Sequence, residues 1–224
     1  MQQMAIKVVW FCTSSSNPNE QSSANLDALN FLRALKGERI EGEAIIPIAG
    51  QNRRLSNSNL DEAIDWFGEM VASYFERQGL DPPFYLVPIP DTNTTVESST
   101  GPWTSLTAMA IASKLEGDVE ALDVLRWKKN LSYLSAETQD STRLYENLAL
   151  LGKTQWDKPV VLVDYLAANA ARAQACEAFL RANGARVLLC VFAGRIVPEK
   201  PEKNFAVFRA EVAGINPVPP RSAD

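Results

Sequence analysis

Apolar runs that read as strands alternate with helix-patterned segments through the second half of the chain. We predict strands at residues 84–90, 119–125, 159–164 and 185–193, and helices at about 102–116, 143–151 and 168–183. The run PVVLVD (159–164) is apolar up to its final residue, Asp164, a pattern typical of a strand buried on both faces of a parallel sheet. This alternation predicts an α/β fold with a mostly parallel, twisted sheet and helices on both faces.

The first 80 residues follow a different pattern. A short strand is expected at residues 5–11 and a polar loop at 13–23, followed by a helix with apolar positions 26–35 that Gly37 ends. Residues 44–49 form an expected second strand, at an edge because of Pro47. Ser58 and Asp61 resemble a capping box that opens a helix to about residue 78, which Gly79 closes. We therefore expect a hood-like α+β addition at residues 1–80, a core at 81–212 and a flexible tail at 213–224.

Composition narrows the chemistry. The chain has no histidine, which excludes a histidine-based triad or a histidine-ligated metal, and we predict no metal site from its residues. The net charge of −5 argues against a broad nucleic-acid surface. No apolar stretch is long enough to span a membrane, and the N-terminal sequence does not read as a signal peptide. With its three scattered cysteines, which fit reduced core positions, the chain is expected to be cytoplasmic, with no membrane partner.

Polar residues follow three of the predicted strands. The carboxyl ends of parallel strands meet at one edge of the sheet, where ligands bind in open α/β folds. The first of these ends carries Pro90, Asp91 and Thr92, and the second carries Arg126, Lys128 and Lys129. The third runs from Asp164 and Tyr165 to Arg172, at the start of a helix whose free N–H groups favour anions.

These residues resemble a known family. The segment VVLVDYLAANAAR (160–172), with the helix and strand that follow it, is similar to the signature of type I phosphoribosyltransferases, and within them of the ComF-like branch. The strand LVPIP (86–90) and the segment LRWKKN (125–130), with Arg143 and Asn147 further on, agree with that family. The resemblance covers residues 84–195 well and the first 80 residues poorly. It implies the family's fold and binding of phosphoribosyl pyrophosphate with Mg²⁺.

The resemblance also assigns roles to individual residues. Asp164 would bind the ribose hydroxyls, and Tyr165 stands where the family has a second acidic residue. The loop that would hold the 5′-phosphate consists of Ala168, Asn169, Ala170, Ala171 and Arg172, where the family typically has Thr-Thr-Gly-Ala-Thr. The hydroxyl donors and the glycine that lets the backbone wrap around phosphate are therefore missing. Pro90, Asp91 and Thr92 would lie in the pyrophosphate loop, with Arg126, Lys128 and Lys129 facing it.

Two functions remain open on this reading. The first is a divergent, repurposed phosphoribosyltransferase-like protein that binds a nucleotide-like or phosphosugar ligand, a protein partner or a second copy of itself. The second is an active phosphoribosyltransferase that transfers ribose 5-phosphate from phosphoribosyl pyrophosphate, with Mg²⁺, to an unknown base. An unrelated nucleotide-binding fold is a weaker third reading, since the chain has neither a G-x-G-x-x-G motif nor a P-loop.

The same residues also have purely structural interpretations. Asp164 can serve as a cap, and the basic cluster can be a solvated loop. Trp127, Tyr133 and Tyr145 either stack on a base or pack in the core.

Overall fold

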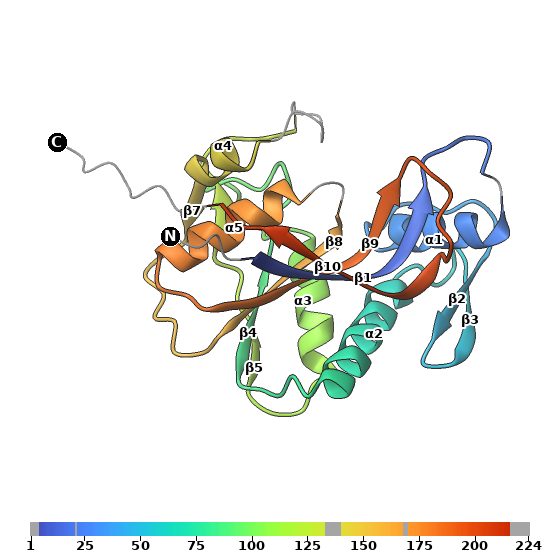
Figure 1. Cartoon of the computed structure of the whole chain (residues 1–224), viewed down its shortest axis with the longest axis horizontal. Helices are drawn as coiled ribbons and strands as arrows, with labels where there is room; N and C mark the ends of the chain where they lie inside the picture. The colour runs from blue at the N-terminus through green and yellow to red at the C-terminus, as the bar shows by residue number, and fades with distance from the viewer. Residues whose placement is uncertain (1–4, 21, 133–139, 168–169, 216–224) are drawn as a thin grey trace.

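The computed structural model describes residues 5–20, 22–132, 140–167 and 170–215, and its main element is a six-stranded mixed sheet (Figure 1). Five strands run parallel, and β10 is antiparallel to its neighbour β1. The strands, in spatial order, are β10 (Phe205–Ala213), β1 (Ala5–Ser15), β9 (Val187–Val197), β8 (Val160–Leu166), β4 (Phe84–Pro88) and β5 (Val119–Ala121). Two small two-stranded sheets pair β2 (Ala44–Ile48) with β3 (Gln51–Leu55) and β6 (Leu125–Trp127) with β7 (Leu148–Leu150).

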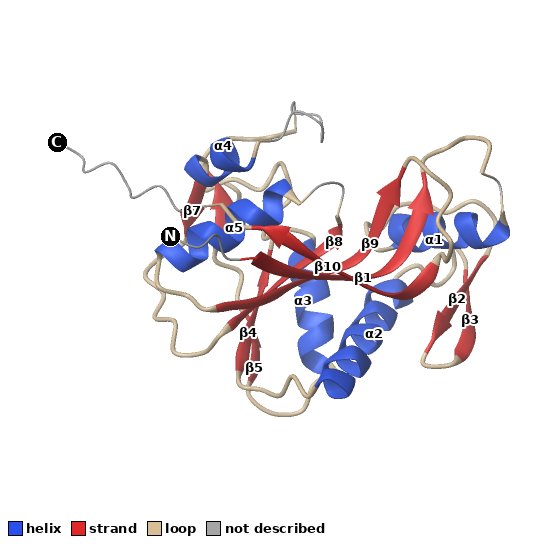
Figure 2. Cartoon of the chain, viewed as in Figure 1, coloured by secondary structure: helices blue, strands red, loops and turns tan. Residues whose placement is uncertain are grey.

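Five helices within the described residues cover both faces of the main sheet, which makes three layers (Figure 2). On one face lie α1 (Ser23–Ala34), α2 (Glu62–Gln78) and α3 (Thr104–Ser113), and on the other lie α4 (Ser141–Glu146) and α5 (Ala171–Ala182). Successive residues of β8 alternate between the two cores: Val161 and Val163 pack toward α2 and α3, and Leu162 packs toward α5. The predicted α/β class, with a mostly parallel sheet covered on both faces, is therefore confirmed.

The strand β1 lies inside the main sheet, between β9 and β10. Val8 pairs with Cys190 of β9 on one side and with Ala210 of β10 on the other. The boundary expected at residue 80, between an N-terminal addition and a core of residues 81–212, would separate β1 from both of its neighbours in the sheet. The rest of this N-terminal segment, α1, the β2–β3 hairpin and α2, packs on the main sheet.

Several predicted elements differ from the structure. The expected strand at 119–125 is divided into β5, which pairs with β4, and β6, which belongs to the small sheet with β7. The expected helix at 143–151 is α4 followed by β7, and Asp140 caps α4 by accepting from the backbone N–H groups of Thr142 and Arg143. The capping box at Ser58 is wrong, because α2 begins at Glu62 and its N-cap Asp61 makes no side-chain cap hydrogen bond.

Other expectations are confirmed. Gly79 ends α2 in the left-handed conformation with φ 61°, and Pro47 lies in the two-stranded hairpin, where every strand is an edge. Cys12, Cys176 and Cys190 are free and buried. The strands β3 and β10 were not predicted, and most of the expected tail, residues 216–224, lies outside the described residues. No helix among the described residues is both long and apolar enough to cross a lipid bilayer.

Candidate functional site

The chain reverses its direction of travel across the sheet at β4. It passes from β4 to β5 on one side and later places β8 on the other side, so β4 and β8 are neighbours at a topological switch point. Pro88 pairs with Val163, and the N–H of Ile89 donates to the carbonyl oxygen of Val163 at 2.8 Å. Crevices at such switch points, beyond the carboxyl ends of the strands, are where open α/β folds bind ligands. Asp91 and Asp164, predicted from their positions at strand ends, are both located here.

The carboxylate of Asp164 is held within the protein. Its side chain is 1% exposed, and its Oδ1 accepts from the backbone N–H of Tyr165 at 2.8 Å. Its Oδ2 lies 2.9 Å from Nη2 of Arg172, whose side chain is 12% exposed. Burial raises the pKa of Asp164 to about 6, against the opposing attraction of the Arg172 charge. The acidic residue at the end of β8 is thus paired with a cation from the first turn of α5.

The start of α5 offers no hydroxyl group at the described positions. The N-cap is Ala170, which makes no side-chain cap hydrogen bond, and the buried Ala171 follows it. The predicted loop residues Ala168 and Asn169 lie outside the described residues. Arg172 is the only charged side chain among the five loop positions, and it points back to Asp164.

A pocket of about 300 Å³ opens next to this ion pair. Its walls come from the end of α1, the loop after β4, the start of α3, the segment after β6 and the end of β8. The lining residues are Lys36, Asp91, Thr92, Asn93, Trp103, Ser132 and Tyr165. Two aromatic side chains, one ammonium group and one carboxylate therefore face a single small space.

The charged groups of the pocket are arranged around its aromatic walls. The ammonium nitrogen of Lys36 lies 5.2 Å from the centroid of the Tyr165 ring, within the range of a cation–π contact. Burial, together with the Asp164 carboxylate, raises the pKa of the Tyr165 phenol, so Tyr165 is a neutral donor at physiological pH. Burial also raises the pKa of Asp91, although the backbone N–H of Trp103 donates to its Oδ2. The other oxygen, Oδ1, is buried and has no hydrogen-bond partner among the described residues.

Trp103 joins the N-terminal part of the chain to the site. Its indole N–H donates to the carbonyl oxygen of Leu35, at the end of α1. A Cβ atom at Gly37, which has φ 70°, would come within 3.1 Å of the Trp103 ring. Lys36, Asn93, Trp103 and Ser132 were not predicted as site residues. The signals in the sequence were a lysine beside a helix-ending glycine and a tryptophan directly after Pro102, and neither pattern by itself indicates a site.

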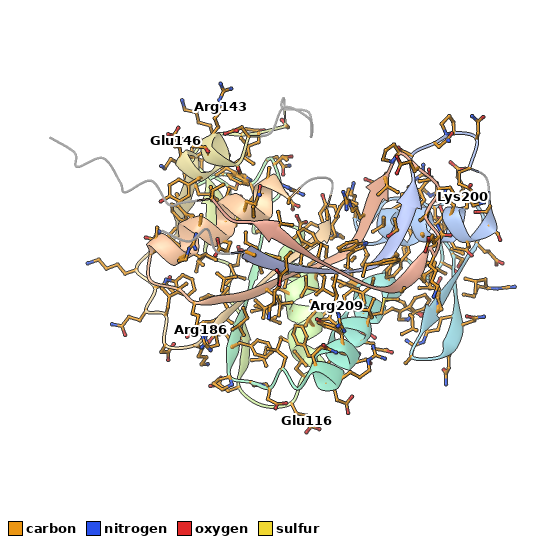
Figure 3. All side chains as sticks on the ribbon, viewed as in Figure 1. Glu116, Arg143, Glu146, Arg186, Lys200 and Arg209 are labelled. Carbon is orange, nitrogen blue, oxygen red and sulfur yellow. The ribbon has the colours of Figure 1, made fainter. Side chains whose placement is uncertain are left out.

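The predicted basic cluster does not line the pocket. Arg126 is 5% exposed and forms a two-point ion pair with Asp123, at 2.5 and 2.9 Å. Lys128 Nζ donates to the carbonyl oxygen of Glu146 at 2.8 Å, and the exposed Lys129 has its backbone bound on both sides by the Asn147 amide. Each of the three residues therefore has a separate structural role. Arg143, expected with Asn147, extends from α4 into solvent (Figure 3).

The predicted pyrophosphate-loop residues lie at the pocket. Asp91 and Thr92 line it, whereas the buried Pro90 uses its carbonyl oxygen to accept from the Trp127 indole at 3.2 Å. Trp127 is fully buried and Tyr145 is 9% exposed, so both pack in the core. Tyr133 lies outside the described residues.

Among the described residues, no group of three or more aspartate, glutamate, cysteine or histidine side chains lies close enough together to hold one ion. A Mg²⁺ ion that arrives with a phosphate ligand needs only one or two carboxylates from the protein. One oxygen of Asp164 accepts from a backbone N–H, and the other, which is buried and makes no hydrogen bond among the described residues, is ion-paired with Arg172, so Asp164 does not present the free carboxylate that Mg²⁺ prefers.

The site therefore has a definite character: a small polar pocket with aromatic walls beside an internally neutralised carboxylate. No protein-family model matches the chain, and no curated protein matches its sequence.

Proposed function

We propose that this chain is a type I phosphoribosyltransferase-like protein of the ComF-like kind, repurposed as a non-catalytic protein that binds a nucleotide-like or phosphosugar ligand. The observation that carries the proposal is the ion pair between Asp164 and Arg172. The resemblance gives Asp164 the role of binding ribose hydroxyls, yet both of its oxygens already face groups of this chain.

Freeing the Asp164 carboxylate to bind a ligand would cost considerable free energy. Breaking a buried ion pair leaves a charge without its partner and typically costs about 3–5 kcal/mol. A cost of that size lowers affinity by a factor of about 10² to 10³ or more. Phosphoribosyl pyrophosphate would also meet no hydroxyl donor at Ala170 or Ala171, so its binding would be weakened at the sugar and at the phosphate.

The adjacent pocket supports binding of a nucleotide-like ligand in a way that does not use the Asp164 carboxylate. Trp103 and Tyr165 both line the pocket, and either ring can stack on a planar base. Lys36, which lines the pocket, can pair with a phosphate. At about 300 Å³ the pocket is at the small end of the range for ligand sites, which suits a mononucleotide better than a larger ligand.

The second candidate is an active phosphoribosyltransferase that uses Mg²⁺ and an unknown base. Asp164 is retained at the end of β8, and the pocket lies directly beside it, where a base would have to lie. Transfer in this family depends on positioning and on stabilising a cationic sugar, which needs no histidine. This candidate requires Arg172 to leave Asp164 when the ligand arrives.

Isothermal titration calorimetry separates the two candidates. We expect no measurable binding of phosphoribosyl pyrophosphate with Mg²⁺ by the unaltered protein, and micromolar binding of one or more nucleoside monophosphates. Lys36→Ala should weaken the nucleotide at least about 10-fold, since a charge-assisted contact contributes about 1.5–3 kcal/mol. Lys128→Ala is the matched control, because Lys128 binds a backbone carbonyl away from the pocket and should change nothing.

Restoring the family's loop gives a second arm. The variant Tyr165→Asp, Ala168→Thr, Asn169→Thr, Ala170→Gly, Arg172→Thr should gain binding of phosphoribosyl pyrophosphate if only this loop and its ion pair prevent it. Micromolar binding of phosphoribosyl pyrophosphate by the unaltered protein, lost in Asp164→Asn, would contradict the non-catalytic proposal and support the second candidate.

A further inference from the structure

The outer edge of β10 is a strand edge that is open to pairing. β10 is nine residues long and is bound on one side by β1, and among the described residues no strand pairs with its other side (Figure 1). Gln174 of α5 donates to the carbonyl oxygen of Ala213 at 2.7 Å, which affects only the last residue of the strand. The opposite edge of the sheet is β5, which has three residues and offers little to pair with. Long open edges are templates for pairing with another strand, and most proteins shorten or cover them.

The sequence of β10, FAVFRAEVA, is nearly self-complementary around Ala210. If two copies of the strand pair antiparallel about a two-fold axis at Ala210, Arg209 of each copy lies opposite Glu211 of the other. Outside this pair of charges, Phe208 lies opposite Val212, and Val207 lies opposite Ala213. Every directly opposed pair is therefore of opposite charge or apolar, which is the combination that stabilises neighbouring strands.

The charges also select this register against its neighbours. Only alternate residues of a strand direct their N–H and C=O groups outward, and each of them must lie opposite another such residue of the second copy. The two-fold axis can therefore pass only through a residue position and not between two residues. An axis at Arg209 places the two Arg209 side chains opposite each other, and an axis at Glu211 does the same with the two glutamates. Like charges directly opposite each other are destabilising. Charges that serve only to prevent edge pairing can have any sign. In β10 the two charges next to Ala210 have opposite signs, which favours pairing about Ala210 instead.

Neighbouring contacts hold the side chains of β10 in place. The Arg209 guanidinium lies over the Tyr74 ring of α2, 5.4 Å from its centroid, and Figure 3 shows Arg209 beside that helix. On the other face, Phe208 stacks on Trp10 with the ring centroids 5.5 Å apart. Val207, by contrast, is 38% exposed, and it lies on the same face as Arg209 and Glu211. The edge is therefore an ordered strand with an apolar side chain still available for contact.

We propose that β10 pairs with β10 of a second copy of this chain, antiparallel about Ala210, so that two six-stranded sheets become one continuous sheet. The interface is isologous, as in most homodimers. Because it is one strand wide, it belongs with small, reversible interfaces. This proposal is independent of the ligand that the pocket binds.

Charge exchange tests the pairing. In sedimentation-velocity experiments over a concentration series, the unaltered chain should show a reversible monomer–dimer equilibrium. Arg209→Glu alone, or Glu211→Arg alone, places like charges opposite each other twice in every dimer and should weaken association at least about 10-fold. The double variant Arg209→Glu/Glu211→Arg restores opposite charges in the same register and should recover the dimer. Circular dichroism of each variant checks that the fold is retained.

Cross-linking tests the register. With the axis at Ala210, the two Cα atoms of residue 210 lie about 4.5–5.5 Å apart, within reach of a disulfide. Ala210→Cys should therefore form a covalent dimer under mild oxidation, while Ser113→Cys, on exposed α3, should not. The three native cysteines are buried and do not interfere.

Two results would overturn the proposal. One is a chain that stays monomeric throughout the concentration series. The other is a dimer that survives both single charge changes, which would locate the interface elsewhere, for example on the exposed α3 residues Leu106 and Met109.

Discussion

Removal of the Arg172 guanidinium should destabilise the fold by an amount that depends on pH. In Arg172→Met the aliphatic part of the side chain is kept, while Asp164, 1% exposed, loses the one cation that pairs with it among the described residues. Two charges about 4 Å apart attract each other by about 4 kcal/mol at an effective dielectric constant of about 20. Breaking one side of a buried pair costs about 3–5 kcal/mol. Because the Arg172 side chain is 12% exposed, we expect the lower end, about 3 kcal/mol, at pH 8.

The pH dependence follows from the carboxyl group. The pKa of Asp164 is raised from 3.8 to about 6 by burial, so the folded state holds a proton that the unfolded chain releases. Asp164 therefore stabilises the fold fully below pH about 4, and this contribution of about 3 kcal/mol is lost as the pH rises through about 6. Below pH 6 the carboxyl group is mostly neutral even beside Arg172. At about pH 5.5, Arg172→Met should consequently cost less than about 1 kcal/mol.

Urea unfolding followed by circular dichroism measures both values by linear extrapolation. The chain would tend to precipitate at its isoelectric point of about 5.0, so the lower of the two pH values is kept above that point. Arg54→Met is the control, since Arg54 pairs with Glu43 at 3.3 Å on the surface, with more than half of each side chain exposed, and its loss should cost under about 1 kcal/mol. The double variant Asp164→Asn/Arg172→Met should lose the pH dependence. A loss below 1 kcal/mol at pH 8, or an equal loss at both pH values, would refute this account of the pair.

Two further predictions concern packing away from the pocket. Gly68→Ala should lower the free energy of unfolding by about 1–3 kcal/mol, because the added Cβ would lie 2.9 Å from the carbonyl oxygen of Ala110 and force α2 away from α3. Thermal denaturation measures this loss, and an unchanged melting temperature would contradict the close approach of the two helices. Asn25→Ala should lower the free energy of unfolding by about 1–3 kcal/mol, because the buried Asn25 side chain accepts from the backbone N–H of Ser15 at 2.6 Å and no water can replace it easily. Ser16→Ala, at an exposed position, is the control. Equal losses of stability in the two variants would argue against a specific role of Asn25.

The sequence predicted those parts of the fold that depend on local pattern. The strands β4, β8 and β9 are continuous apolar runs, and their burial on both faces follows directly from that pattern. The strand β10 escaped prediction because Arg209 and Glu211 interrupt its apolar residues, and because its pairing partner β1 lies about 200 residues earlier in the chain. A pattern confined to a few residues contains no information about that pairing.

The site residues divide in the same way, into those that a local pattern predicts and those that only long-range packing brings together. Asp91 and Asp164 could be placed from the rule that strand ends converge, and the structure brings both to the switch point. Lys36 and Trp103 could not, because they reach the pocket through the packing of α1 against the start of α3. Arg126 was assigned to the site because it is a basic residue at a strand end. Its partner Asp123 lies three residues before it, and that spacing was visible in the sequence.

The central place of β1 has a consequence for how the chain acquires its structure. Residues 5–15 pair with residues 190–197 and 205–213, so the middle of the sheet joins segments that leave the ribosome at very different times. Until residues 187–197 emerge, β1 has neither of its neighbouring strands, and it lacks β10 until residues 205–213 follow. Contacts of such long sequence separation slow folding and leave apolar surface exposed to aggregation meanwhile. A nascent chain arrested before residue 187 should therefore depend on chaperones, although its helices and the strands β4 and β5 are already complete.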